Sequence, residues 1–272
     1  MLLSLRRAYL VLLLCCSIAG AQTLAHPGWH GNGIASEAWW KHAAFVRFDA
    51  DTTFTKAAES MDAISAAGAD SLILPDMLPT GLAQPDAAGA TRPFDSKFGD
   101  EQDLDTLLRE ASARRMHVVL HADLLRLAGN AGELRFWMSR GIAGFDLGDV
   151  TPAQTDTLQL LRGAMDHFPG RRILLAHVPE ISNKRLRGQD AVTLHLLSQQ
   201  ESAAGRGPAS VAIEIHTADA LKSPLPANTA VVINATLLQS ETVCEDLRQA
   251  LAARGHSHSP VRSGRHRSRK PS

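Results

Sequence analysis

The sequence is poor in cysteine, and its three cysteines are unevenly placed. Cys15 and Cys16 lie in an apolar segment near the start, which leaves Cys244 alone in the remainder of the chain. If that segment is removed after export, the mature fold cannot contain an internal disulfide bond, even in a compartment that permits one. Its stability must then come from a buried core, and about 230 residues of ordinary apolar content are enough for one.

Long apolar runs are also scarce, since residues 8–18 form the only candidate. Two arginines precede this run and a small-residue site, Ala-Gly-Ala, follows it, which is the order of a secretory signal peptide. A membrane span needs about 20 apolar residues. We therefore predict a signal peptide at residues 1–21, no transmembrane anchor after cleavage, and a periplasmic or secreted protein. The alternatives are an uncleaved anchor and lipid attachment at Cys15 or Cys16, where the preceding Leu14 is bulkier than expected.

Acidic residues are absent from residues 254–272, which contain six basic ones, whereas residues 22–253 contain 20 basic and 28 acidic residues. The tail has no apolar periodicity, so we predict a basic, disordered segment. We interpret it as a solubilising terminus; adhesion to anionic surfaces or nucleic acid is the alternative, and no specific nucleic-acid partner is predicted. Its histidines lack the defined spacing of a metal site.

Short apolar runs alternate with amphipathic segments through residues 22–253. The predicted strands number seven and lie at residues 44–48, 69–75, 117–123, 142–147, 172–178, 211–217 and 229–234. Helices of about 10 to 16 residues between strands indicate parallel βαβ units. Residues 191–204 are predicted to be helical. The carboxyl ends of the strands, where polar residues follow the apolar runs, are where chemistry is expected in such repeats.

Four segments carry a family resemblance. They read EAWWKHA from Glu37, GADSLILPDMLP from Gly68, FDSKFGDEQDLDTLLREASARRMHVVL from Phe94 and RFWMSRGIAGFDL from Arg135. In order and spacing they resemble the first four strand-and-helix units of the α-amylase family, glycoside hydrolase family 13, over about residues 37–180. The resemblance implies an α/β fold, a parallel TIM-type (β/α) barrel. With seven candidate strands, we predict that residues 22–253 form an incomplete barrel.

The resemblance also implies a retaining reaction on α-glucosidic bonds, with two carboxyl groups about 5 to 5.5 Å apart, one a nucleophile and one an acid/base. At the matching positions this sequence has Gly148 for the nucleophile and His177 for the acid/base. His121 stands where the third strand would end in Asp, and Asp146 stands where an Arg would precede the nucleophile. Glycine cannot attack an anomeric carbon. The resemblance therefore implies a pseudoenzyme without the standard glycosidase activity.

Three nearby carboxylates are candidates for relocated catalysis. Asp149 comes one residue after the nucleophile position, where a strand side chain normally points to the other face unless the strand bends. Asp123 should point the same way as His121, because two residues separate them. Glu180 follows His177 in a predicted loop. An acid/base pair of Asp149 and Glu180 would restore an active α-glycosidase; solvated loop carboxylates are the simpler interpretation.

Trp39 and Trp40 offer two other interpretations, a sugar-stacking surface or a plug under the barrel, and Trp is more often core. His121 and His177 could bind a metal with Asp123, but nothing fixes their separation, so no metal and no cofactor is predicted. We expect a carbohydrate-associated protein whose partner is an α-glucan or oligosaccharide. The alternatives are the active glycosidase with relocated acids and a non-enzymatic scaffold, for which the sequence names no protein partner.

Overall fold

The computed structural model describes residues 38–77, 94–177, 191–198, 210–226 and 229–255. Its strands form one closed parallel barrel in sequence order. They are β1 Ala44–Arg47, β2 Ser71–Leu74, β3 His117–His121, β4 Gly144–Asp149, β5 Ile173–His177, β6 Leu194–Ser198, β7 Val211–Ile215 and β8 Ala230–Asn234. The barrel closes where β1 pairs with β8, Phe45 lying opposite Val232. The predicted α/β, TIM-type fold is confirmed.

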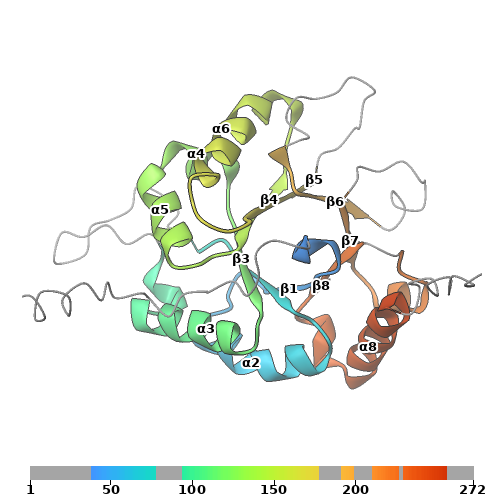
Figure 1. The fold of residues 1–272 in the computed structure, drawn as a ribbon. Helices are drawn as coiled ribbons and strands as arrows, with labels where there is room; N and C mark the ends of the chain where they lie inside the picture. The colour runs from blue at the N-terminus through green and yellow to red at the C-terminus, as the bar shows by residue number, and fades with distance from the viewer. Residues whose placement is uncertain (1–37, 78–93, 178–190, 199–209, 227–228, 256–272) are drawn as a thin grey trace, which may run out of the picture. The chain divides into compact units, whose positions relative to one another are not determined.

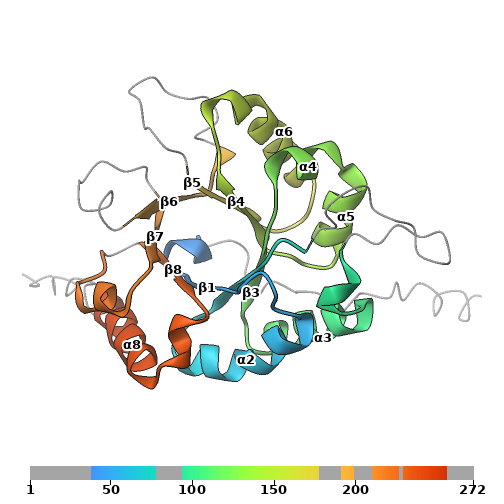
Figure 2. The same cartoon turned by 180° about the vertical axis from the view of Figure 1, so that it is seen from behind.

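The α-helices lie outside the ring of strands in both views along the barrel (Figures 1 and 2). They are α2 Phe54–Ala66, α3 Glu101–Ala113, α4 Leu124–Gly129, α5 Ala131–Ser139, α6 Thr155–Met165 and α8 Glu241–Gly255. Side-chain caps begin several of them. Thr53 accepts the backbone N–H of Lys56 at the start of α2, and Asp100 and Asp103 form a reciprocal capping box at the start of α3. Such caps satisfy backbone donors that the first helical turn leaves free.

The barrel is complete, and the expectation of an incomplete one with seven strands is wrong. The strand that the sequence did not reveal is β6, within residues predicted to be helical. Its sequence, LHLLS, is a short apolar run, and periodicity alone cannot tell such a run from a buried helical turn. Pairing decides the matter, because β6 lies between β5 and β7, with Ala176 opposite His195 and Leu197 opposite Ile213.

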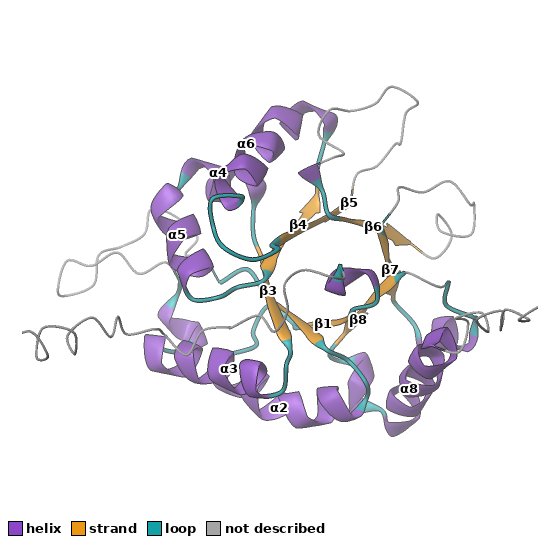
Figure 3. Cartoon of the chain, viewed as in Figure 1, coloured by secondary structure: helices purple, strands orange, loops and turns teal. Residues whose placement is uncertain are grey.

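The core has two layers. Alternate strand residues point into the barrel, where Phe45, Ile73, Val119 and Leu175 form one buried cluster. The intervening residues, such as Val46, pack against the surrounding helices in a second and larger cluster. This alternation follows from the two-residue period of a strand. Figure 3 shows the resulting arrangement of strands within and helices outside.

The amino ends of the strands are covered by the short 3-10 helix η1, Trp39–Lys41, which lies within the outline of the ring in Figures 1 and 2. Trp39 and Trp40 pack against the inner cluster of the barrel. The Trp39 ring stacks on His117, the first residue of β3, with ring centroids 3.6 Å apart and planes 5° apart. Both tryptophans therefore occupy the position of a plug beneath the barrel.

The predicted signal segment and nearly all of the predicted tail lie outside the described residues. The tail was predicted to begin at Arg254, whereas α8 continues to Gly255. Arg254 extends this helix because its guanidinium donates hydrogen bonds to the carbonyl oxygens of Thr229 and His42, which the sequence pattern did not reveal. Within the described part of the chain, every helix is too short or too polar to span a bilayer.

Candidate functional site

A cavity of about 630 Å³ opens at the carboxyl ends of the strands, opposite the tryptophan plug. Its walls come from seven of the eight strands, β1 to β7, or from the residues directly after them. The charged and titratable side chains that line it are Arg47, Asp76, His121, Asp146, Asp149, His177 and Glu214. In parallel barrels this end of the strands carries the functional residues, because the loops that follow the strands meet there.

Asp146 is the centre of the polar contacts in this cavity. Its side chain is fully buried, and Arg47 Nη2 donates to its Oδ2 over 2.9 Å. His121 Nδ1 lies 3.3 Å from the same oxygen, and the backbone N–H of Gly148 donates to Oδ1 over 3.2 Å. Burial raises the pKa of the Asp146 carboxyl, but His121, Arg47 and the Gly148 N–H outweigh it and hold this pKa below its ordinary value. Asp146 is therefore a carboxylate.

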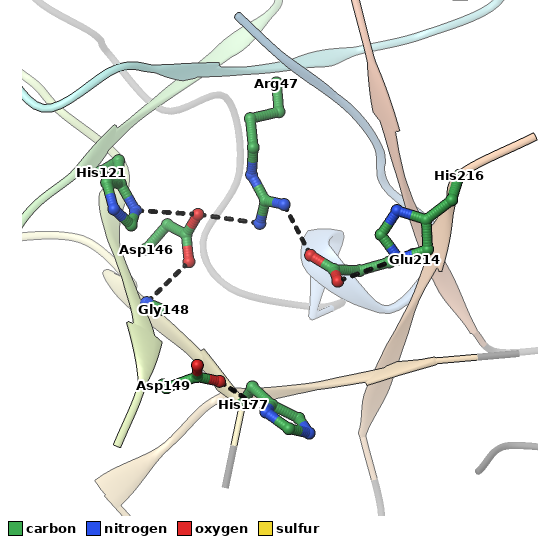
Figure 4. Close-up of polar contacts among 8 residues, drawn as sticks. All are labelled: Arg47, His121, Asp146, Gly148, Asp149, His177, Glu214 and His216. Atoms are coloured by element: carbon green, nitrogen blue, oxygen red, sulfur yellow. Dashed lines mark hydrogen bonds and ion pairs between the residues drawn. The ribbon is translucent and has the colours of Figure 1, made fainter. Parts of the chain in front are cut away.

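Arg47, at the end of β1, links side chains of β4 and β7, two strands that are not neighbours in the barrel. Its Nη1 donates to Glu214 Oε1 over 2.6 Å, while its other terminal nitrogen holds Asp146. Figure 4 shows the guanidinium between the two carboxylates, with His216 beside Glu214. His216 Nε2 lies 3.5 Å from Glu214 Oε2. We call the set Arg47, His121, Asp146 and Glu214 the mouth network.

Asp149 reaches the cavity because β4 bends at Gly148. The pairing of β4 with β5 shifts register between Asp146 and Asp149, and Gly148 has a φ of +60°, in the left-handed region. Glycine adopts this conformation without the steric cost that a Cβ brings. The bend turns Asp149 toward β5, where its Oδ1 lies 2.6 Å from His177 Nδ1. A regular strand would have pointed Asp149 to the opposite face.

His121 and His177, which the sequence resemblance aligns with carboxylate positions, both line the cavity. His121 ends β3 and His177 ends β5, and each contacts an aspartate through Nδ1. Contact with the Asp146 carboxylate raises the pKa of His121, although burial opposes the change. The Asp146 carboxylate therefore stabilises the protonated form of His121.

Asp123 does not face the cavity with His121, and that expectation is wrong. The strand ends at His121, so the alternation of faces does not continue to residue 123. Instead, Asp123 is the N-cap of α4, and its Oδ1 accepts the backbone N–H of Arg126 over 2.8 Å. A metal site formed by His121, His177 and Asp123 is not assembled. Among the described residues, no group of three or more His, Cys, Asp or Glu is placed to hold a metal ion.

Two other candidates lie elsewhere. Glu180 falls outside the described residues. Trp39 and Trp40 lie at the amino ends of the strands, so they share no surface with the carboxylates of the mouth.

The sequence did not identify Arg47 as a site residue, nor Asp76, which accepts from Arg126 Nη2 over 2.7 Å. A charged residue at the end of an otherwise apolar strand was the available signal for Arg47. The mouth network joins residues from β1, β3, β4 and β7, and no local pattern brings these together.

The architecture is that of a (β/α)₈ barrel with a polar cavity in the position of an active site. No family model and no curated protein matches the chain. An α-amylase from Lactobacillus plantarum is similar in structure, with a TM-score of 0.57, 11% identity, and coverage of 80% of this chain and 81% of that one. An α-amylase from Malbranchea cinnamomea gives a TM-score of 0.56, 10% identity and coverage of 80% and 78%. The fold of this chain is therefore similar to that of the barrels of these two α-amylases.

Similarity to an isomaltulose synthase from Klebsiella sp. LX3 is weaker, with a TM-score of 0.44 and 11% identity. The alignment covers 60% of this chain and 50% of the synthase, so the chain spans about half the length of that enzyme. At these identities the likeness to the two α-amylases shows the fold alone.

Proposed function

We propose that this protein is exported and binds an oligosaccharide at the mouth of its α-amylase-like barrel, without the standard α-glycosidase reaction. The observation that carries the proposal is the bend at Gly148. The position that would hold the attacking carboxylate has no side chain, and its backbone N–H supports Asp146 instead. His177 occupies the position of the acid/base and contacts Asp149.

The contacts of the remaining carboxylates in the mouth also argue against the double-displacement reaction. That reaction needs one ionised carboxylate free to attack and one carboxyl group that can give up a proton. Asp146 is fully buried between Arg47 and His121, and Glu214 is held by Arg47. An attack by either would break an ion pair in the mouth network. The low pKa of Asp146 also makes it a poor proton donor near neutral pH.

The cavity remains suited to a sugar. Small-molecule sites commonly enclose about 300 to 1,000 Å³, and this cavity of about 630 Å³ lies within that range. Carboxylate, imidazole and guanidinium groups can accept from and donate to sugar hydroxyl groups. The two α-amylases with a similar barrel support an α-glucan or α-linked oligosaccharide as the ligand to test first.

Calorimetric titration of the mature protein with maltooligosaccharides tests the binding, and cellooligosaccharides of the same length serve as the control. We expect saturable binding of the α-linked series, a ligand-dependent rise in Tm, and no release of reducing sugar. Glu214→Gln should weaken binding, whereas Glu241→Gln, on α8 outside the ring of strands and absent from the lining of the cavity, should not. Equal behaviour of wild type and Glu214→Gln would contradict the assignment of the mouth.

An active glycosidase with relocated acids is the second candidate, because Asp149 lines the cavity. In that case the purified protein releases reducing sugar, and both Asp149→Asn and Glu180→Gln abolish the release. Turnover that depends on both residues would replace the proposal of a non-catalytic protein. Turnover that survives both substitutions would exclude this pair.

Two further results bear on the proposal. Recovery of processed protein, with residues 1–21 removed, outside the cytoplasm would support export, whereas full-length protein in the cytoplasm would refute it. Absence of any sugar effect, together with a protein partner captured through residues 254–272, would favour a scaffold.

A further inference from the structure

A second cavity, of about 450 Å³, lies near the amino ends of β5 and β6, on the plug side of the barrel. Its lining includes Trp40, three arginines and one carboxylate, that of Asp166. The arginines are Arg162 on α6 and the consecutive pair Arg171 and Arg172 before β5. This excess of positive charge contrasts with the mouth, whose lining contains one arginine and four carboxylates.

Arg172 is a buried cation, with only 9% of its surface exposed. Its Nη1 donates to the carbonyl oxygen of Ile142 over 2.8 Å and more weakly to that of Gly141 over 3.4 Å. Its Nε is buried without an acceptor among the described residues. Burial lowers the pKa of Arg172, and no neighbouring carboxylate in the described part of the chain opposes this effect.

Burying a charge without an opposite charge is unfavourable, and one unmatched donor adds to the cost. The two carbonyl oxygens follow helix α5, whose C-terminal end carries partial negative charge. They satisfy Nη1 and leave Nε unpaired. A structural role in holding the turn before β4 therefore accounts for the hydrogen bonds of Nη1. Nε, on the other side of the guanidinium, still needs an acceptor.

The contacts of the neighbouring arginines provide no acceptor for Nε of Arg172. Arg162 Nε donates to Asp166 Oδ1 over 2.9 Å, and Arg162 Nη1 donates to the carbonyl oxygen of Arg172 over 2.9 Å. Asp166 is thereby engaged by Arg162. Arg171 is exposed and forms no ion pair with any residue that the structure describes. The described lining of this cavity thus contains three guanidinium groups and one carboxylate, and that carboxylate is bound by Arg162.

Gly170 brings the edge of the cavity close to the guanidinium of Arg172. It lines the cavity, and a Cβ built on it would lie 4.0 Å from both Nε and Cζ of Arg172. Its φ of +90° also favours glycine. A longer side chain at this position would cover the side of Arg172 on which Nε has no acceptor.

We propose that this cavity is a binding site for an oxyanion, held by Arg172 and Arg171. Guanidinium groups present paired N–H donors that match the oxygens of phosphate, sulfate or carboxylate. The Trp40 indole in the same lining offers an apolar face for a sugar ring that carries such a group. The site does not depend on the proposed sugar binding at the mouth, because it uses no residue of that cavity.

Calorimetric titration of the mature protein with inorganic phosphate, at constant ionic strength adjusted with sodium chloride, tests the site. Glucose 6-phosphate and glucose are titrated in parallel. We expect saturable binding of phosphate that Arg171→Gln weakens by about tenfold, since a charge-assisted contact is lost. Arg135→Gln, an equal change of charge at an exposed position of α5, should leave the affinity unchanged. Arg171 makes no described contact that the fold needs, so this variant should fold.

Arg172→Met should abolish binding, and Gly170→Leu should block the cavity without changing the charge. Tighter binding of glucose 6-phosphate than of phosphate, lost in Trp40→Phe, would identify the ligand as an acidic sugar. Equal affinities would identify a free oxyanion. Absence of saturable binding in the wild type, or equal affinity in wild type, Arg171→Gln and Arg135→Gln, would overturn the proposal.

Discussion

Strand β3 has a histidine at each end, and the two histidines have opposite acid–base properties. His117, at the amino end, is stacked under Trp39, and burial lowers its pKa to about 4. His121, at the carboxyl end, contacts the buried Asp146, which raises its pKa. Both side chains point into the barrel from one strand of five residues. The surroundings at the two ends, rather than the residue type or the strand, decide which protonation state is favoured.

The comparison separates an apolar end of the barrel interior from a polar end. The amino end is closed by aromatic rings that pack on the inner core, where charge is costly. The carboxyl end keeps a cavity in which charged side chains contact one another, as Arg47 contacts both Asp146 and Glu214. Conventional (β/α)₈ enzymes divide their two ends in the same way. Five predictions test this division, and they are given from the largest expected effect to the smallest.

Asp146→Asn should have the largest effect, because it removes the buried charge that faces both Arg47 and His121. We expect a loss of about 3 to 5 kcal/mol in the free energy of unfolding, the usual cost of breaking one partner of a buried ion pair. Equilibrium unfolding in urea at pH 7 measures it. Asp149→Asn is the matched control, since Asp149 is 80% exposed and should cost less than about 1 kcal/mol. Equal losses would show that the mouth network does not stabilise the barrel.

His117 should make the barrel sensitive to acid. Its folded pKa of about 4 lies below the ordinary value of 6.5, so the unfolded chain takes up the proton first as the pH falls. The wild type should lose about 3 kcal/mol relative to His117→Phe between pH 6.5 and pH 4. Unfolding curves of both proteins across this range give the difference, and Phe retains a ring beneath Trp39. Parallel pH profiles for the two proteins would contradict the burial of His117.

Gly148→Ala should destabilise the fold by about 1 to 2 kcal/mol, because a residue with a Cβ is strained in the left-handed region. The added Cβ would also lie 3.3 Å from His121 Cε1. Gly163→Ala is the control, since a Cβ there meets nothing within 4 Å, and within helix α6 it should stabilise by about 0.5 to 1 kcal/mol. Thermal and urea unfolding distinguish the two.

Gly148→Asp extends the same test to chemistry. It restores a carboxylate at the nucleophile position but places it on a bent strand. We expect no release of reducing sugar from maltooligosaccharides. Release of sugar would show that the loss of one side chain, rather than the rearranged mouth, removed the activity.

His121→Gln should have the smallest effect and the opposite pH dependence to His117→Phe. The raised folded pKa of His121 means that its contribution is present below pH 6.5 and is lost as the pH rises through the folded pKa. Because the side chain is 41% exposed, the loss should be below about 1 kcal/mol. Unfolding at pH 5.5 and pH 8.5 tests the sign. A larger loss at pH 8.5 would refute the pairing with Asp146.

The sequence pattern located most of the barrel because each strand and helix carries its own local signals. Helix α3 illustrates this, with its capping box at Asp100 and Asp103 and its apolar face at Leu104 and Leu107. Strand β6 carried no such signal and was recognised only through its partners. The orientation of Asp123 was predicted wrongly because an Asp that caps a helix and an Asp at the end of a strand look alike in sequence. Local pattern thus predicts elements well and their exact ends poorly.

The candidate site was predicted in part. His121, His177 and Asp149 all line the cavity, but the contacts that define their roles come from other strands. Arg47 and Glu214 are 167 positions apart in the chain, and only closure of the barrel brings them together. The bend that presents Asp149 also depends on the changed register between β4 and β5.

The sequence by itself determined the alternation of strands and helices and the absence of a carboxylate at residue 148, because these depend on residue type and local spacing. The tertiary structure decided the closure of the barrel, the use of the tryptophans as its plug, and the opposite protonation preferences of His117 and His121. Burial and the nearest opposite charge set those preferences. Both are properties of the folded chain, contributed by residues distant in sequence.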